Sequence, residues 1–243
     1  ADLRFEIGDV EQANSLLDTF YQSDAPETLR MQARLRALQI ANDMNSSKRI
    51  REILFDTDWQ VKAMPNIAVL SFAALDAGDR LLQEGHYSDA VRAYRLTLPR
   101  KILIEKQQER LYAVEHRLAQ HSRFASDIWN SYFQQLMAGL RAQLELLQTM
   151  DDYSPGLYLR AGQAYLLGQR FREATILFRT VAQTAEFAAE LRAEAHYRWI
   201  VALSEAADWQ GARTTAQLFL NEHSNHPLVN RACFLIARAY QGE

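Results

Sequence analysis

Apolar residues recur at intervals of three and four along most of the chain, which is the spacing of one face of an α-helix. The segment 125–149 shows this spacing most fully, because large apolar residues follow one another at these intervals from Trp129 to Leu147. A sustained alternation with a period of two, which would indicate half-buried strands, is absent from the sequence. The pattern therefore predicts an all-α protein.

Prolines and turn residues divide this pattern into separate helices. Pro26, Pro65, Pro155 and Pro227 each stand where a new helical pattern begins, a position where the fixed φ of proline and its missing N–H cost little. The spacing predicts helices or helical pairs over 1–21, 26–43, 48–55, 65–84, 87–98, 101–121, 125–149, 155–182, 189–206, 209–221 and 227–241. These lengths suit hairpins of two helices joined by short turns.

Two stretches of the chain share one pattern of large and small residues. Residues 74–97 and residues 158–181 place these residues at the same offsets, 84 positions apart. In the second stretch the small pair Ala161 and Gly162 would allow two helices to approach closely, and Phe178 would fill the space between them. A repeat of this kind is typical of a binding scaffold rather than of an enzyme.

Residues 155–182 resemble a tetratricopeptide repeat. The pattern of that family has a pair of small residues, an aromatic, a turn glycine, a second aromatic, an alanine and a further aromatic. The matching residues are Ala161, Gly162, Tyr165, Gly168, Phe171, Ala174 and Phe178. Residues 71–98 match nearly as well, whereas residues 193–220 have Trp199 and Ile200 in place of the small pair. The resemblance implies a right-handed α-solenoid of stacked helical hairpins.

A finer resemblance lies in the linker from Phe219 to Leu228, which contains Asn221, His223 and Pro227. This linker is similar to the tetratricopeptide repeats of bacterial cell-envelope proteins. Examples are a periplasmic coordinator associated with the Tol–Pal system and a lipoprotein of the outer-membrane β-barrel assembly machinery. The resemblance implies a periplasmic or envelope-associated location, with a cytoplasmic location as the alternative.

We expect a single tetratricopeptide-like unit over residues 1–243 with four parts. These are degenerate hairpins over 1–60, a well-matched hairpin over 65–98, a longer non-consensus pair over 100–150, and hairpins over 155–243 that end in a lone helix. The non-consensus pair is interpreted as stacked in the array, and an inserted helical arm is the alternative. The pattern begins in a second helix and stops in a first helix. Apolar edges are therefore expected at both ends, covered by more repeats or by another subunit.

Composition and charge narrow the range of partners. Hydrophobic residues make up 48% of the chain, and the formal net charge of −3 gives no electrostatic reason to expect a nucleic acid or a membrane surface. No stretch approaches the ~20 apolar residues of a transmembrane helix, so direct membrane insertion is not expected. Cys233 is the only cysteine, which excludes an intrachain disulfide. Residues 1–24 are acidic and residues 27–55 are basic, which solvated helix faces would explain.

Residue patterns that would indicate catalysis are weak throughout the sequence. There is no glycine-rich phosphate loop and no nucleophile motif around a serine. His223 and His226 lie in a turn before Pro227 with only Glu222 as a nearby further ligand, and this spacing does not indicate a metal site. The sequence therefore predicts a protein that is not an enzyme and has no cofactor and no metal.

The inward-facing residues of the first helix of each hairpin form the candidate partner-binding surface. In a stack of hairpins these helices line the concave face, where a peptide or an amphipathic helix can lie. The candidates at equivalent offsets are Leu75, Asp79, Leu82, Leu159, Gln163, Leu166, Tyr197, Val201, Ser204, Phe234 and Arg238. Burial against the neighbouring hairpin is the alternative for the apolar members. Trp129, Tyr132 and Phe133 are a second candidate patch, although their helical spacing favours the core.

These observations support one leading hypothesis, a non-catalytic scaffold that binds a protein or peptide partner, within a bacterial envelope assembly. The alternative is a regulatory or substrate-recruiting segment of a larger enzyme or polymer-export protein. A small-molecule sensor with a pocket between residues 101–149 and the repeats is a third hypothesis. Self-association through uncapped ends is a further expectation.

Overall fold

The computed structural model describes residues 2–6, 8–59, 66–121 and 127–242, and every regular element in these ranges is an α-helix. The all-α prediction is therefore confirmed, with boundaries within a few residues of those expected. Pro65 and residues 122–126 lie outside the described residues. The helices are α1 (Asp2–Glu6), α2 (Val10–Tyr21), α3 (Glu27–Asp43), α4 (Ser47–Asp56), α5 (Ile67–Gln83), α6 (Tyr87–Leu96), α7 (Arg100–His121), α8 (Asp127–Thr149), α9 (Ser154–Leu167), α10 (Phe171–Gln183), α11 (Ala189–Glu205), α12 (Trp209–Glu222) and α13 (Val229–Gly242).

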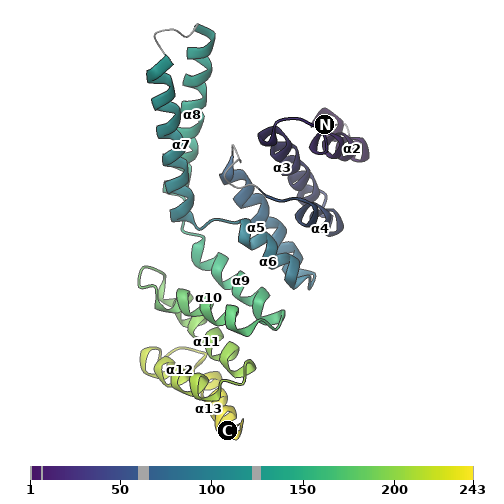
Figure 1. The fold of residues 1–243 in the computed structure, drawn as a ribbon. Helices are drawn as coiled ribbons and strands as arrows, with labels where there is room; N and C mark the ends of the chain where they lie inside the picture. Colours follow the sequence, from purple (N-terminus) through teal and green to yellow (C-terminus); the bar gives the residue numbers. More distant parts are fainter. Residues whose placement is uncertain (1, 7, 60–65, 122–126, 243) are drawn as a thin grey trace.

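Helices that follow one another along the chain pack against each other (Figure 1). α5 packs on α6 and α9 on α10, while α11 contacts both α10 and α12. The first helices of successive hairpins also touch, since α3 contacts α5 and α5 contacts α9. Such sequential packing is consistent with a helical repeat.

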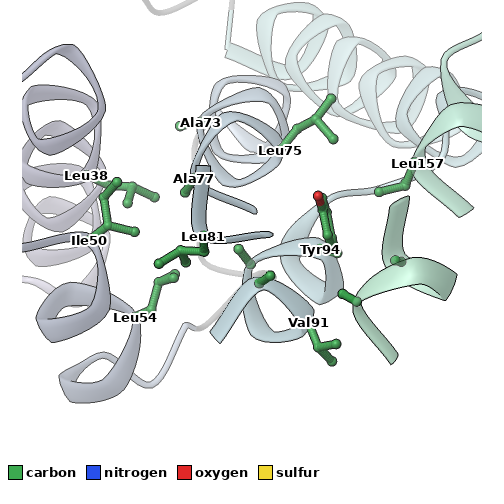
Figure 2. Packing of buried hydrophobic residues seen from close by; sticks show 14 of the residues in the cluster. Leu38, Ile50, Leu54, Ala73, Leu75, Ala77, Leu81, Val91, Tyr94 and Leu157 are labelled. Atoms are coloured by element: carbon green, nitrogen blue, oxygen red, sulfur yellow. The ribbon is translucent and has the colours of Figure 1, made fainter. Parts of the chain in front are cut away.

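The main hydrophobic core runs from α2 to α11. Figure 2 shows part of this core. Leu38 of α3 and Ile50 of α4 lie on the side of Leu81 of α5. On the opposite side of the hairpin α5–α6, Tyr94 of α6 lies toward Leu157 of α9. Burial of each large side chain contributes about 1.5–3 kcal/mol to folding. A second, smaller cluster around Phe219 joins α11, α12 and α13.

The turns of the hairpins α3–α4, α5–α6, α9–α10 and α11–α12 each contain one residue in the left-handed backbone region. In the hairpin α5–α6 this residue is Gly85, at φ +81°, where glycine carries no steric penalty. At the equivalent position in the hairpin α9–α10 the residue is Gln169, at φ 60°. Gly168, the expected turn glycine, is therefore not the residue with positive φ.

α7 and α8 form a long antiparallel pair that extends away from the other helices (Figure 1). In the described part of the pair, the buried contact with α5 lies at the base, where Leu103 and Leu147 pack with Ala68. α6 and α9 contact each other directly, so the succession of hairpins continues past the pair. The stacked interpretation of residues 100–150 is therefore wrong, and the inserted arm describes the structure.

Ion pairs between helices account for part of the charge imbalance in the N-terminal region. Asp18 of α2 accepts hydrogen bonds at 2.6 Å from both Arg34 of α3 and Arg49 of α4. Arg34 is only 5% exposed, and its Nε donates to Thr57 Oγ1 at 2.9 Å. The prediction of solvated faces is thus wrong for Arg34, which is a buried cation with partners on two other segments.

Among the helices of the described ranges, none combines the length and the hydrophobicity needed to cross a membrane.

Candidate functional site

A hollow of about 300 Å³ lies on the side of the molecule where the first helices α3 and α5 meet. A second hollow of about 290 Å³ adjoins it and shares Asn42, Asp43 and Asp76 with it. We call these two adjoining hollows together the α3–α5 groove. Its lining is Arg36, Gln39, Asn42, Asp43, Val69, Phe72, Ala73, Asp76, Asp79, Arg80 and Gln83.

The helical period explains why polar and apolar residues of α5 both face this groove. Phe72, Asp76, Asp79 and Gln83 follow one another on α5 at spacings of four, three and four, so they lie along one stripe of the helix. The opposite stripe of α5 carries Leu81 and other buried residues of the main core. One side of α5 is thus fixed by packing, and the other side presents an apolar end and an acidic end to the groove.

Asp79 is held in place by side chains of α6 and α9. It accepts a hydrogen bond at 2.8 Å from the hydroxyl of Tyr94 on α6 and one at 2.6 Å from Arg160 Nη1 on α9. Burial raises the pKa of the Tyr94 hydroxyl, and the hydrogen bond to Asp79 raises it further, so this hydroxyl stays a donor. Asp79 therefore ties α5, α6 and α9 together at the edge of the groove.

Asp43 and Asp76 are the carboxylates of the groove that lack a protein partner. In the described part of the chain neither takes part in a hydrogen bond or an ion pair. Partial burial raises the pKa of Asp76, the charge of Asp79 raises it further, and Arg160 and Arg80 oppose the shift. Arg80 donates its own hydrogen bond to Asn45 Oδ1. Both carboxylates are exposed to solvent, so a cation entering the groove could form an ion pair with either of them.

The structure divides the predicted partner-binding residues into buried, packed and exposed groups. Leu75, Leu159 and Ser204 are buried and contribute to packing. The others with mainly packing roles are half-buried: Leu82, Leu166, Tyr197 and Val201. Burial against neighbouring helices, the alternative interpretation, describes the apolar members of α5, α9 and α11.

The remaining predicted residues are polar or lie on α13. Gln163 accepts a hydrogen bond from Arg198, and Arg238 pairs with Glu205 at 2.9 Å. Phe234 is 68% exposed. Of the predicted set, only Asp79 lines the α3–α5 groove. The structure does not bring the eleven residues together into one exposed surface.

Sequence reasoning missed Asp43 and Asp76. Asp76 lies three residues before Asp79, so the shared helix face was a signal that could have identified it. Asp43 ends α3, and only the contact between α3 and α5 brings it to the same groove.

The aromatic residues of α8 are not in the core, contrary to the helical-spacing prediction. Trp129 is 58% exposed and Tyr132 is 55% exposed, while Phe133 is half-buried. Their rings contact one another, with the centroids of Tyr132 and Phe133 5.6 Å apart. They form an aromatic patch on the arm, outside the α3–α5 groove.

Comparison with known proteins adds no family assignment: no protein-family model matches the chain, and no curated protein matches it significantly. What the fold defines is an all-α protein whose helices pack in sequence order, consistent with a helical repeat.

Proposed function

We propose that this protein is a non-catalytic, tetratricopeptide-like scaffold that binds a segment of another protein in the α3–α5 groove. A basic side chain of that segment lies between Asp43 and Asp76. The observation that carries the proposal is the pair of carboxylates without protein partners in a groove formed by the first helices of neighbouring hairpins.

The lining of the groove supports a peptide rather than a small metabolite. The two adjoining hollows continue along both helices, which suits an extended segment. Val69 and Phe72 offer apolar contact at one end, and Asp43 and Asp76 offer hydrogen-bond acceptors to a Lys or Arg at the other. Asp43 and Asp76 are exposed, so each ion pair with a basic side chain contributes about 0–1 kcal/mol, and two such pairs favour a basic residue at one position of the segment.

The rigidity of the groove also supports binding. Asp79 fixes α5 to α6 and α9, and Asn42 Nδ2 donates to the Ala73 carbonyl at 2.9 Å, which fixes α3 to α5. A preformed groove lowers the entropy cost of binding a flexible segment.

Selection of random peptides displayed on phage tests the proposal. Peptides are selected on the full chain and their affinities are then measured by fluorescence anisotropy for wild type and for the Asp43→Asn, Asp76→Asn double variant. We expect the selected peptides to share a Lys or Arg at one position and to lose about threefold to tenfold in affinity for the double variant, because both carboxylates are exposed. The control is Asp24→Asn, Asp151→Asn, which changes the net charge equally at two exposed positions outside the groove.

The results separate two failures of the proposal. Peptides that bind wild type and both double variants equally would place the binding surface away from the groove. A selection that enriches no peptide would contradict the scaffold function itself.

The proposed location is the bacterial cell envelope, and it rests on the linker from Phe219 to Leu228. Fractionation of cells of the source organism with an antibody to the chain tests it, since recovery in the cytoplasmic fraction would contradict it.

A further inference from the structure

Three side chains with metal-binding atoms meet at the contact between α11 and α12. His196 lies on α11, Glu222 is the last residue of α12, and His223 follows directly. One ligand atom from each of the three lies within 4.8 Å of the other two. The fold thus brings His196 of α11 next to His223, which follows α12.

The separations of the donor atoms are close to those of a metal site. His196 Nδ1 lies 3.6 Å from Glu222 Oε2, and His223 Nε2 lies 3.9 Å from the same oxygen. In a tetrahedral zinc site with bonds of about 2.0–2.1 Å, ligand atoms lie about 3.3–3.4 Å apart. The Glu222 side chain is 60% exposed, so it is free to make the small movement that closes the site.

The hydrogen bond on the far side of His196 fixes the tautomer that a metal requires. His196 Nε2 lies 3.2 Å from the carbonyl oxygen of Thr215, and this oxygen can only accept a hydrogen bond. Nε2 therefore carries the hydrogen, and the Nδ1 of the neutral ring presents its lone pair to Glu222. Metal-binding histidines commonly donate their other N–H to a carbonyl in this way. The lone pair faces a carboxylate oxygen, and a cation between them would satisfy both.

Aromatic contacts hold the two imidazole rings in place. Trp199 stacks on His196 with ring centroids 5.6 Å apart, and the edge of Phe219 contacts the same ring at 5.5 Å. Phe219 also contacts His223 at 5.0 Å. His196 is buried, so aromatic side chains cover one side of the ligand cluster. The other side, at Glu222, is exposed to solvent.

His226 is close to the cluster but is engaged elsewhere. Its Nδ1 accepts a hydrogen bond from the Leu228 N–H at 3.2 Å, so its Nε2 carries the hydrogen and points to Glu190 at 3.2 Å. Charge on His226 and on Arg192 disfavours a cation at His223, while the charge of Glu222 favours one. The ligand set is therefore two histidines and one glutamate.

We propose that His196 Nδ1, Glu222 Oε2 and His223 Nε2 bind a divalent zinc-class metal ion. Imidazole and carboxylate donors in this combination suit Zn²⁺, and three protein ligands leave one position for water or for a donor group of a partner. The ion fastens the end of α12 to α11 and so stabilises the smaller core cluster. The sequence-based expectation of no metal considered His223 with His226, whereas the structure pairs His223 with His196.

Metal binding by the metal-free full chain tests the proposal. Zn²⁺ is titrated by calorimetry, and Co²⁺ is titrated by visible absorption, which reports the coordination of the ion. We expect one ion per chain, competition between the two metals, and a rise in the thermal midpoint on adding Zn²⁺. Glu222→Gln keeps the size of an exposed side chain and is expected to weaken binding about tenfold or more. His226→Ala is the matched control and is expected to bind as wild type does.

Other outcomes would overturn the assignment. Wild type that binds no Zn²⁺, or that binds it equally after Glu222→Gln, would show that His196, Glu222 and His223 do not together form a metal site. Loss of binding only in the His226→Ala variant would move the site to Glu190. Because His196 is buried, the test does not rely on its removal, and nitrogen NMR of His196 before and after Zn²⁺ addition reports directly whether Nδ1 binds the ion.

Discussion

The ring of Phe178 lies directly against the backbone of Gly162, so that a Cβ on residue 162 would stand 2.6 Å from Phe178 Cε1. Tyr94 and Gly78 have the same relationship, with 2.6 Å between a Cβ on residue 78 and Tyr94 Cε1. The first pair joins α9 to α10 and the second joins α5 to α6. Two hairpins separated by the arm therefore have the same close approach at the same position of their pattern.

Adding a methyl group at Gly162 is expected to force these helices apart. Phe178 is fully buried, so its ring has no free space to move into. We expect Gly162→Ala to lower the free energy of unfolding by about 1–3 kcal/mol, measured by urea denaturation. On α8, nothing lies within 4 Å of a Cβ on Gly139. Gly139→Ala is the control and is expected to raise stability by up to ~1 kcal/mol, because alanine favours helix. Equal effects of the two changes would contradict the packing argument.

The hairpins could be predicted from the sequence because their signals are local. Gly162 and Phe178 belong to adjacent helices joined by a short turn, so their pattern alone indicates the contact. The position of the arm could not be predicted in the same way. A helical pair that buries a seam along its own length gives one apolar pattern whether it stacks in the array or extends from it.

The candidate sites could not be predicted because their residues come from different segments. Asp43 and Asp76 share a groove only because α3 packs on α5. His196 and His223 meet only because α11 packs on α12. Sequence spacing within a single helix carries no signal for either juxtaposition, although it does place Asp76 and Asp79 on one face.

Removal of the Asp18 charge is expected to destabilise the N-terminal hairpins. Asp18 pairs with the buried Arg34, and loss of a partner leaves a buried cation uncompensated. The side chain of Asp18 is 33% exposed, which screens the pair in part. We therefore expect Asp18→Asn to lower the free energy of unfolding by about 2–3 kcal/mol in urea denaturation.

The exposed ion pair of Asp2 with Arg36 supplies the matched control. Asp2→Asn is expected to change stability by no more than ~0.5 kcal/mol, because exposed pairs contribute little. A similar small loss for Asp18→Asn would mean that water reaches Arg34 and compensates its charge.

The arm is expected to be dispensable for folding of the remaining helices. Hydrogen bonds of Arg100 hold the start of α7 close to the end of α8 and the start of α9. The Arg100 N–H donates to Ser154 Oγ at 2.9 Å, and Arg100 Nε donates to the Leu147 carbonyl at 2.8 Å. We expect replacement of residues 108–142 by a short Gly-Ser linker to leave the unfolding transition cooperative and its midpoint within a few degrees of wild type. Circular dichroism with thermal unfolding measures this.

The deletion keeps Leu103 and Leu147, the residues of the arm that are buried against α5. A longer deletion that also removes these two leucines is the comparison. It is expected to lower the thermal midpoint, because Ala68 then loses the two side chains that bury it. Loss of cooperative unfolding after the shorter deletion would show that the array depends on the whole arm.

Binding of a selected basic peptide is expected to weaken as the pH falls. The peptide cation needs ionised Asp76, and partial burial together with the charge of Asp79 raises the pKa of that carboxyl above its usual value. Since the raised pKa belongs to the free protein, protonation competes with the peptide at a higher pH than for an ordinary aspartate. Affinity is therefore full above this pKa and falls as the pH drops through it, while the Lys or Arg of the peptide stays charged. Fluorescence anisotropy over a pH series measures the effect. The Asp76→Asn variant is expected to bind weakly and to lose this transition, and an unchanged pH profile in that variant would assign the titration to another group.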